Sequence, residues 1–272
     1  MNYMRGELTR RALIRSAAGV GAVTALGAAG ILPIATASAA EDDTDKYDFL
    51  IARVRFKLTQ NVVDVWNTGP GAERNLLEEL TKYVRCKVKL PQGCYCNDPY
   101  YGEDRHFNAV VDFSGPVSPQ KYPFLLMTSE GYFSFNSTQK TNLKNYVDGG
   151  GFIFMDDCVA GMGTDFFYQS AHNMVNEVYG SGALTVIPKT HEVFNNVFDL
   201  SKTGLPNVSG VYHPAEGLWR GDRIGIILSS TDIHCGWIDK HHNWYTAARG
   251  KTAGYEDAIQ FGINMIVYVL AH

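Results

Sequence analysis

Residues 122–128 read YPFLLMT, a short and uninterrupted apolar run. Two further runs share this character, FIFM at 152–155 and RIGIILS at 223–229. Such runs are typical of strands that are buried on both faces, as in a parallel sheet. An earlier segment, FLIARVRF at 49–56, alternates apolar and polar residues and indicates a further strand. Together these four segments predict the central sheet.

The segments between these strands have the pattern of helices. Apolar side chains recur three or four residues apart in 72–84, and FNSTQKTNLKNYVDGGG at 135–151 has capping residues at its start and glycine at its end. We also expect helices over 166–179 and 255–270, short strands over 84–90 and 183–187, and loops over 91–121, 188–219 and 236–254. Strands that alternate with helices predict an α/β fold with a mostly parallel sheet and helices on both faces.

The first forty residues resemble a twin-arginine signal peptide. Arg10 and Arg11 precede an apolar segment at 17–34, and the small residues ATASAA follow at 35–40. This is the order of a basic region, an apolar region and an A-x-A cleavage site. The apolar segment is short and weakly apolar for a transmembrane helix. We therefore expect cleavage after Ala39 and export by the twin-arginine machinery to the periplasm or the extracellular space, which leaves a single α/β domain at 41–272.

The composition of the remaining chain excludes several partners. Residues 1–40 carry four arginines and one glutamate, so the rest of the chain has a net charge of −7. An acidic chain without a basic patch does not favour nucleic acid as a partner. No second apolar run is long enough to span a membrane.

All five cysteines lie beyond the leader, at Cys86, Cys94, Cys96, Cys158 and Cys235. The spacing of Cys94 and Cys96 is compatible with a metal clip, a local disulfide or two separate partners, but it is not the C-x₂-C spacing of zinc ribbons. We favour a staple between this loop and Cys86. Cys158 and Cys235 each follow a predicted strand, so their thiols can approach one another and form a disulfide or share a metal ion.

Polar side chains follow several of the predicted strands. In an open parallel sheet, ligands bind outside the carboxyl ends of the strands. This rule selects Asp156, Asp157, Glu130 and His234 as candidates for catalysis, Asn67, Arg74, Ser129, Asp232 and Trp237 for ligand binding, and Cys158 and Cys235 for thiol chemistry. We expect these side chains to lie at one edge of the sheet, with Glu130, one of the two aspartates at 156 and 157, and Asp232 or His234 sharing one cleft.

Asp156 and Asp157 are sequence neighbours at the end of a predicted strand. Neighbouring side chains in a strand point to opposite faces of the sheet. Only one of the two carboxylates is therefore expected to face a ligand, while the other caps a helix. A similar limit applies to His234 and Cys235, because sequence neighbours rarely form a nucleophile and base pair.

Several strings resemble the bacterial domain of unknown function 4159. These strings are WNTGPGAERNLLEEL, YPFLLMTSEGYFSF, LKNYVDGGGFIFMDDC, CGW and GYEDAIQFGINMIVYVL. That family is similar in fold to class I glutamine amidotransferases, which implies a flavodoxin-like sheet. The resemblance places Asp156 or Asp157 where those enzymes present a nucleophilic cysteine on a tight strand–turn–helix, with Cys158 beside it. The aspartate at this place argues against glutaminase chemistry. Glu130 is a departure from the family pattern, which implies a histidine between Ser129 and Gly131.

The sequence therefore predicts an exported domain that binds a small ligand or protein partner at the carboxyl edge of its sheet, without glutaminase activity. One alternative is a hydrolase that uses Asp156 or Asp157, alone or through a metal ion, with Glu130 and His234 assisting. Another is a thiol redox protein built on Cys158 and Cys235. The sequence names no particular ligand, metal or cofactor.

Overall fold

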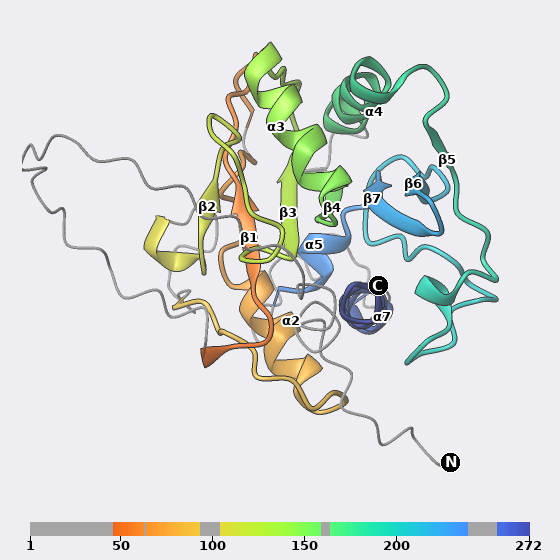
Figure 1. Cartoon of the computed structure of the whole chain (residues 1–272). Coiled ribbons are helices and arrows are strands. Elements are labelled where there is room, and N and C mark those ends of the chain that lie inside the picture. Colours follow the sequence, from red (N-terminus) through yellow and green to blue (C-terminus); the bar gives the residue numbers. More distant parts are fainter. Residues whose placement is uncertain (1–45, 63, 93–103, 159–163, 239–254) are drawn as a thin grey trace, which may run out of the picture.

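The computed structural model describes residues 46–62, 64–92, 104–158, 164–238 and 255–272. These residues form one seven-stranded sheet in the order β2-β1-β3-β4-β7-β6-β5 (Figure 1). The strands are β1 (Ile51–Val54), β2 (Val110–Val111), β3 (Phe124–Ser129), β4 (Phe152–Asp157), β5 (Leu184–Val186), β6 (Glu216–Arg220) and β7 (Arg223–Ser229). Strands β2, β1, β3, β4 and β7 run parallel, while β6 is antiparallel to both of its neighbours. The predicted α/β fold with a mostly parallel, flavodoxin-like sheet is confirmed.

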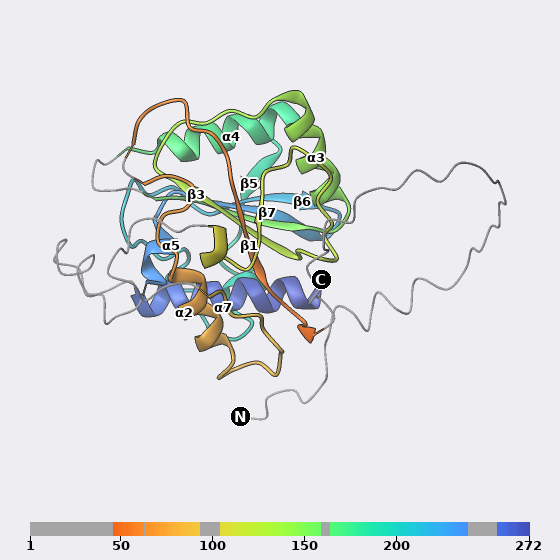
Figure 2. The same ribbon diagram turned by 90° about the vertical axis from the view of Figure 1, so that its left-hand side faces the viewer.

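Helices cover both faces of this sheet (Figure 2). Helices α3 (Ser137–Asp148) and α4 (Phe166–Tyr179) lie on one side, and we call it the α3/α4 face. Helices α2 (Ala72–Leu80), α5 (Ile233–Gly236) and α7 (Tyr255–Ala271) lie on the other side, the α2/α7 face. Two short 3-10 helices, η2 (Asp104–His106) and η3 (Glu192–Phe194), lie in the connections.

Each face of the sheet buries its own core because side chains alternate along a strand. In β3, Phe124 and Leu126 pack on the α2/α7 face, while Leu125 and Met127 pack on the α3/α4 face. A fully buried side chain of this size contributes about 1.5–3 kcal/mol to stability. Since both faces of β3 are covered, its sequence is apolar without interruption, and this is the pattern that made it recognisable.

The start of α3 follows the predicted capping pattern. The side chain of Asn136 accepts a hydrogen bond from the Gln139 amide at 2.9 Å, and the Gln139 side chain accepts one from the Asn136 amide at 3.1 Å. This reciprocal pair satisfies two amides that the helix itself leaves without partners. The helix ends before Gly149, as predicted. The bounds of α4 and β7 also agree with their predictions.

Several predicted elements are wrong. The segment 84–90 forms only an isolated bridge, between Phe49 and Val88, and α2 ends at Leu80 instead of residue 84. The loops predicted over 91–121 and 188–219 contain β2 and β6, respectively. Strand β2 has two residues, which is too short for an alternation of apolar and polar side chains to be visible. Strand β6 forms through its hairpin pairing with β7, which its own sequence does not reveal. A two-residue turn starting at Gly221 (φ +64°) joins these strands, and a glycine there permits the left-handed backbone.

Strand β4 extends two residues beyond the predicted end, so that Asp156 and Asp157 belong to the sheet. The predicted leader at 1–40 and residues 94–96 lie outside the described residues. The predicted staple involves Cys94 or Cys96, which lie outside the described residues, and of its members the structure describes Cys86 alone. Within the described ranges, we find no helix of the length and apolar character that crossing a membrane requires.

Candidate functional site

The carboxyl ends of β1, β3, β4 and β7 lie side by side, and we call this border of the sheet the carboxyl edge. Its polar side chains divide between the two faces. Arg53 contacts Glu73 of α2, so it lies on the α2/α7 face. Asp156 lies on the same face, next to α5, while Asp157 lies on the opposite face, next to α4. The alternation of the strands therefore separates two polar regions at one edge.

Asp156 and Asp157 each bind the first turn of a different helix. Asp156 accepts a hydrogen bond from the backbone amide of His234 in α5 at 2.7 Å. Asp157 accepts one from the amide of Tyr168 in α4 at 2.9 Å. Carboxylates at helix amino termini satisfy free amides and interact favourably with the helix dipole. We expected one of these two carboxyl groups to cap a helix. Both do so, Asp156 on the α2/α7 face of the sheet and Asp157 on the α3/α4 face.

Cys158 and Cys235 bring their sulfur atoms together at the carboxyl edge. The two Sγ atoms are 3.3 Å apart. A ring nitrogen of His234 completes a group whose three potential ligand atoms all lie within 4.8 Å of one another. We call Cys158, His234 and Cys235 the thiol cluster. Asp64 adds a carboxylate oxygen 3.6 Å from Cys158 Sγ, and all four residues are buried.

Backbone contacts hold this cluster in place. The Cys158 amide donates to the Ser129 carbonyl at 3.0 Å and so extends the pairing of β3 with β4. The Ser129 hydroxyl donates to the Asp64 carbonyl at 2.8 Å, and the Thr68 hydroxyl donates to the Asp64 carboxylate at 2.9 Å. Asp232 has a left-handed backbone (φ +60°), which is uncommon for a residue with a side chain and occurs at functional sites. This sharp turn lets α5 begin at the next residue, directly at the edge.

Burial decides the protonation states in the thiol cluster. The hydrogen bond with Cys235 and burial raise the pKa of Cys158 well above its ordinary value. The contact with Cys158 lowers the pKa of Cys235, but burial and the Asp232 carboxylate outweigh it and raise that pKa to about 12. Burial and the Arg53 cation lower the pKa of His234 well below its usual range. At neutral pH, two thiols and a neutral imidazole therefore face one another.

The neighbouring carboxyl groups are also shifted by burial. Burial, and then the charge of Asp232, raise the pKa of Asp156 well above its ordinary value. Burial raises the pKa of Asp157 to about 9, although the hydrogen bond from Tyr168 opposes this shift. One oxygen of each carboxyl, Oδ1, has no hydrogen-bond partner within the described part of the chain. Negative charge is thus costly at this edge unless a cation compensates it.

Arg53 supplies a buried positive charge next to the cluster. Its guanidinium donates to Glu73 at 2.7 Å and to the carbonyls of Trp66 and Thr68 at 2.9 and 3.0 Å. One of its terminal nitrogens lies 3.2 Å from His234 Nε2. Arg53 is fully buried, and its charge is compensated by Glu73. It therefore connects β1 and α2 with the histidine of the cluster.

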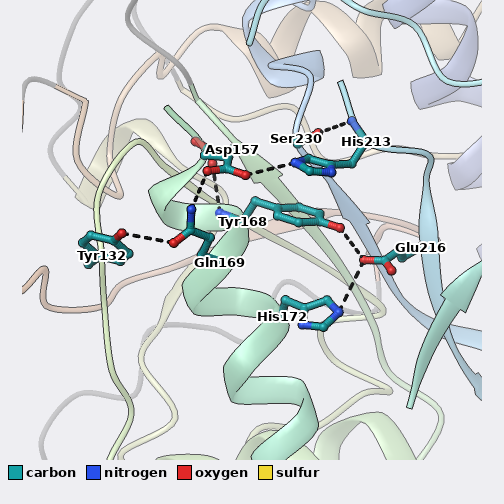
Figure 3. A network of polar contacts seen from close by, with 9 residues as sticks. Tyr132, Asp157, Tyr168, Gln169, His172, His213, Glu216 and Ser230 are labelled. Carbon is teal, nitrogen blue, oxygen red and sulfur yellow. Dashed lines mark hydrogen bonds and ion pairs between the residues drawn. The ribbon is translucent and has the colours of Figure 1, made fainter. Parts of the chain in front are cut away.

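A second polar network lies on the α3/α4 face beside Asp157 (Figure 3). The ring of Tyr168 stacks on His213 with 4.4 Å between ring centroids, and its hydroxyl donates to Glu216 at 2.7 Å. His213 pairs with Asp165 at 2.9 Å, just before α4. These titratable groups are thus paired with one another. The network fastens the start of α4 to β6 and to the segment that precedes it.

The structure brings many of the predicted site residues to one place and leaves others apart. The residues in the thiol cluster or in contact with it are Asp156, Cys158, Asp232, His234 and Cys235. Ser129 reaches the cluster through Asp64. Glu130 lies at the same edge, where it is buried and its amide donates to the Asp64 carbonyl at 3.0 Å.

Three predicted ligand-binding residues have other surroundings. Arg74 forms an ion pair with Glu78 at 2.8 Å, one turn further along α2. Trp237 packs in the core against Phe154 and edge-on against His234, with 6.1 Å between the ring centroids of the latter pair. It therefore adjoins the thiol cluster, but its indole N–H donates to the Ala258 carbonyl at 2.9 Å. Asn67 is half-buried in the connection between β1 and α2.

Sequence reasoning missed Arg53, Asp64 and Glu73. Arg53 had a usable signal, because an arginine within the apolar strand IARV is rarely buried without a partner. Asp64 lies in an irregular connection, where no period marks it. Glu73 resembles any acidic residue in the first turn of a helix, and only the fold shows that it faces Arg53.

The fold and the thiol cluster define an α/β protein with a buried group of sulfur, nitrogen and carboxylate ligands at the carboxyl edge of its sheet. The chain belongs to the family described as a domain of unknown function (DUF4159), whose sequence profile matches residues 105–270. This range runs from η2 to α7 and includes the thiol cluster, whereas Arg53, Asp64 and Glu73 precede it. Comparison with curated proteins gives no significant match.

Proposed function

We propose that this DUF4159 protein binds a thiophilic divalent metal ion, with Zn²⁺ as the reference ion, at the carboxyl edge of its sheet. The ligands are Cys158, Cys235 and His234. The observation that carries the proposal is the approach of these three buried side chains, whose ligand atoms lie within 4.8 Å of one another. Thiolate and imidazole together are the ligand set that selects zinc among the common divalent ions.

The distances in the thiol cluster support a four-coordinate site. Bond lengths of about 2.3 Å to sulfur and about 2.0 Å to nitrogen separate neighbouring ligand atoms in a tetrahedral site by roughly 3.5–3.8 Å. The two sulfur atoms are 3.3 Å apart, and Asp64 Oδ2 lies 3.6 Å from Cys158 Sγ. Small rotations of these side chains therefore suffice to surround one ion.

His234 has the properties that a metal ligand needs. Its lowered pKa keeps the imidazole neutral, which is the form that binds a metal. Nδ1 is buried without a hydrogen-bond partner among the described residues, whereas the Cε1–Nε2 edge packs against Gly69. Coordination requires the tautomer in which Nε2 carries the ring proton and donates it to the Gly69 backbone, which leaves a lone pair on Nδ1. In this tautomer Nε2 does not accept from Arg53, whose guanidinium keeps its bonds to Glu73 and to the Trp66 and Thr68 carbonyls. Coordination through Nδ1 satisfies a buried polar atom that otherwise has no contact.

A cation also resolves the electrostatics of this edge. Asp64, Asp156 and Asp232 lie close to two thiols, and the nearby cation Arg53 is already compensated by Glu73. A divalent ion replaces the two thiol protons and makes neighbouring negative charge favourable. Asp64 is the candidate for the fourth ligand. If it coordinates, the site is closed and structural, whereas an open fourth position can hold water and support the hydrolase alternative.

The proposal includes the absence of glutaminase chemistry. The end of β4 presents Asp157, which binds the start of α4, and the next residue, Cys158, faces Cys235. A cysteine whose pKa is raised by a second thiol and by burial is a poor nucleophile. Metal binding or thiol chemistry fits these surroundings better than attack on a carboxamide.

We predict that the purified protein binds one Zn²⁺ per chain and that Cys158→Ser or Cys235→Ser weakens binding by more than about 100-fold, since even outer-shell changes cost 10–100-fold. Co²⁺ substitution provides the measurement, because thiolate ligands give it intense near-ultraviolet absorption, and competition with Zn²⁺ then gives the affinity. The variant Asp64→Asn tests whether Asp64 is the fourth ligand: weaker Zn²⁺ binding means that its carboxylate coordinates the ion, and unchanged binding means that it does not.

Cys86→Ser is the matched control for these variants. Cys86 is also a free thiol, but it lies next to the Phe49–Val88 bridge, at the opposite end of β1. This variant should bind Co²⁺ and Zn²⁺ as the unchanged protein does. Binding of Co²⁺ without thiolate absorption, or equal binding by Cys235→Ser, would rule out the assigned ligands.

Export before action in the periplasm or outside the cell is a second part of the proposal, and it rests on the leader sequence. The twin-arginine receptor reads the arginine pair as an address. Replacing Arg10 and Arg11 by lysine should therefore retain the precursor in the cytoplasm. Fractionation of cells that produce either form measures this, and normal processing of the double variant would refute twin-arginine export.

A further inference from the structure

The contact between Cys158 and Cys235 has a chemical consequence beyond metal binding. Both side chains are free thiols, and their sulfur atoms are 3.3 Å apart although the residues are 77 positions apart in the chain. We infer that Cys158 and Cys235 form a reversible disulfide, and that this oxidation and metal binding exclude each other. The disulfide itself does not depend on the proposed function, whereas its competition with a metal ion does.

The geometry requires only a small movement. A disulfide bond is about 2.0 Å long, so the two sulfur atoms must approach by roughly 1.3 Å. Cys158 is the first residue after β4, and Cys235 lies in the short helix α5. Cys158 and Cys235 pack together, and Ile238 packs against the pair. Among the described residues, each of these cysteines is therefore the only thiol close enough to form a disulfide with the other after oxidation.

The exposures of the two cysteines assign an order to the reaction. Cys235 is 7% exposed and Cys158 is 0% exposed, so a small oxidant meets Cys235 first. With a peroxide as oxidant, the Cys235 thiol becomes a sulfenic acid and one water leaves. The Cys158 thiol is a poor nucleophile towards an external carbonyl, but it lies 3.3 Å from this sulfenic sulfur and attacks it directly. The disulfide forms, and the thiol proton leaves with the sulfenic hydroxyl as a second water. Two thiols are thereby oxidised by two electrons in all, and hydrogen peroxide is reduced to two waters.

The disulfide removes two of the three proposed metal ligands. A sulfur in a disulfide has no thiolate charge to offer, so His234 is the one proposed ligand that remains, together with Asp64 as the candidate fourth ligand. Oxidation therefore releases the ion, and a thiol reductant restores the ligands. The thiol cluster in this way forms a redox-sensitive metal site.

The test uses the full chain freed of metal by a chelator and treated with one equivalent of hydrogen peroxide. After alkylation of the remaining thiols under denaturing conditions, peptide mapping should show a Cys158–Cys235 linkage that a thiol reductant removes. Cys86→Ser should give the same linkage. Cys158→Ser should instead trap the sulfenic acid on Cys235 as a dimedone adduct, and Cys158→Ala repeats this test should the serine variant not fold. In Cys235→Ser, oxidation of Cys158 should be at least about tenfold slower because that sulfur is more buried.

Two outcomes would overturn the disulfide: a linkage of either cysteine to a different partner, or over-oxidation of Cys235 while Cys158 remains open to alkylation. A separate arm adds Zn²⁺ before the peroxide and should slow the linkage at least about tenfold, because metal-bound thiolates are withheld from the oxidant. An unchanged rate with Zn²⁺ would refute the competition and weaken the proposed metal site, while the disulfide itself would stand.

Discussion

Replacement of Glu73 by alanine should lower the free energy of unfolding by about 3–5 kcal/mol, the usual effect of leaving a buried charge without its partner. Arg53 is fully buried, and Glu73 is only 2% exposed. Without the carboxylate, the guanidinium keeps its carbonyl contacts to Trp66 and Thr68 but loses the only negative charge bonded to it in the described structure. Urea unfolding followed by circular dichroism measures the loss.

The matched control lies on the same helix. Glu78 pairs with Arg74 one turn apart, with both side chains partly exposed to solvent. Such surface pairs contribute roughly 0–1 kcal/mol, so Glu78→Ala should change stability far less than Glu73→Ala. Equal effects of the two substitutions would show that burial does not distinguish these pairs. Since Arg53 contacts His234, Glu73→Ala should also weaken Zn²⁺ binding, unlike Glu78→Ala.

Saturation with Zn²⁺ should raise the free energy of unfolding by about 4 kcal/mol at a free concentration a thousandfold above Kd. The reason is that the ligands come together only in the folded chain, from the end of β4 and from α5, so the ion binds the native state in preference. Thermal or urea unfolding across a series of Zn²⁺ concentrations gives this dependence, and a chelator should reverse it.

Two variants separate a specific site from general zinc effects on stability. Cys235→Ser removes a proposed ligand and should abolish the stabilisation. Cys86→Ser removes a distant free thiol and should retain it. If Zn²⁺ stabilises both variants equally, the ion binds elsewhere in the chain, and the thiol cluster is not its site.

The parts of the fold with strong local patterns were predictable from the sequence. Strand β7 and helix α4 have the predicted bounds, because one is an uninterrupted apolar run and the other is a periodic segment bounded by polar residues and glycine. Strand β6 escaped prediction, because its five residues carry little periodicity of their own and pair as a strand through the hairpin with β7 and through β5. The segment 84–90 had strand-like residues, yet it pairs with the sheet through one bridge only.

The candidate site was predictable in outline. The rule that ligands bind at carboxyl ends of parallel strands selected Asp156, Cys158, His234 and Cys235, and strand alternation indicated that Asp157 faces away from Asp156. Whether these residues catalyse a reaction or bind a ligand stays a prediction. The rule also selected Arg74 and Trp237, because it uses only their positions after predicted strands. It cannot show that Arg74 pairs with Glu78 or that Trp237 packs against Phe154.

The sequence by itself determined that this is an α/β domain. The spacing of apolar residues and the positions of glycine set each helix and strand locally, and the alternation of these elements defines the fold class. Only the tertiary structure decided that Cys158 contacts Cys235, that Asp64 lies beside them and that Arg53 is compensated by Glu73. These contacts join residues 20 to 94 positions apart. No local pattern encodes them, because their geometry arises when the packed sheet brings separate strand ends to one edge.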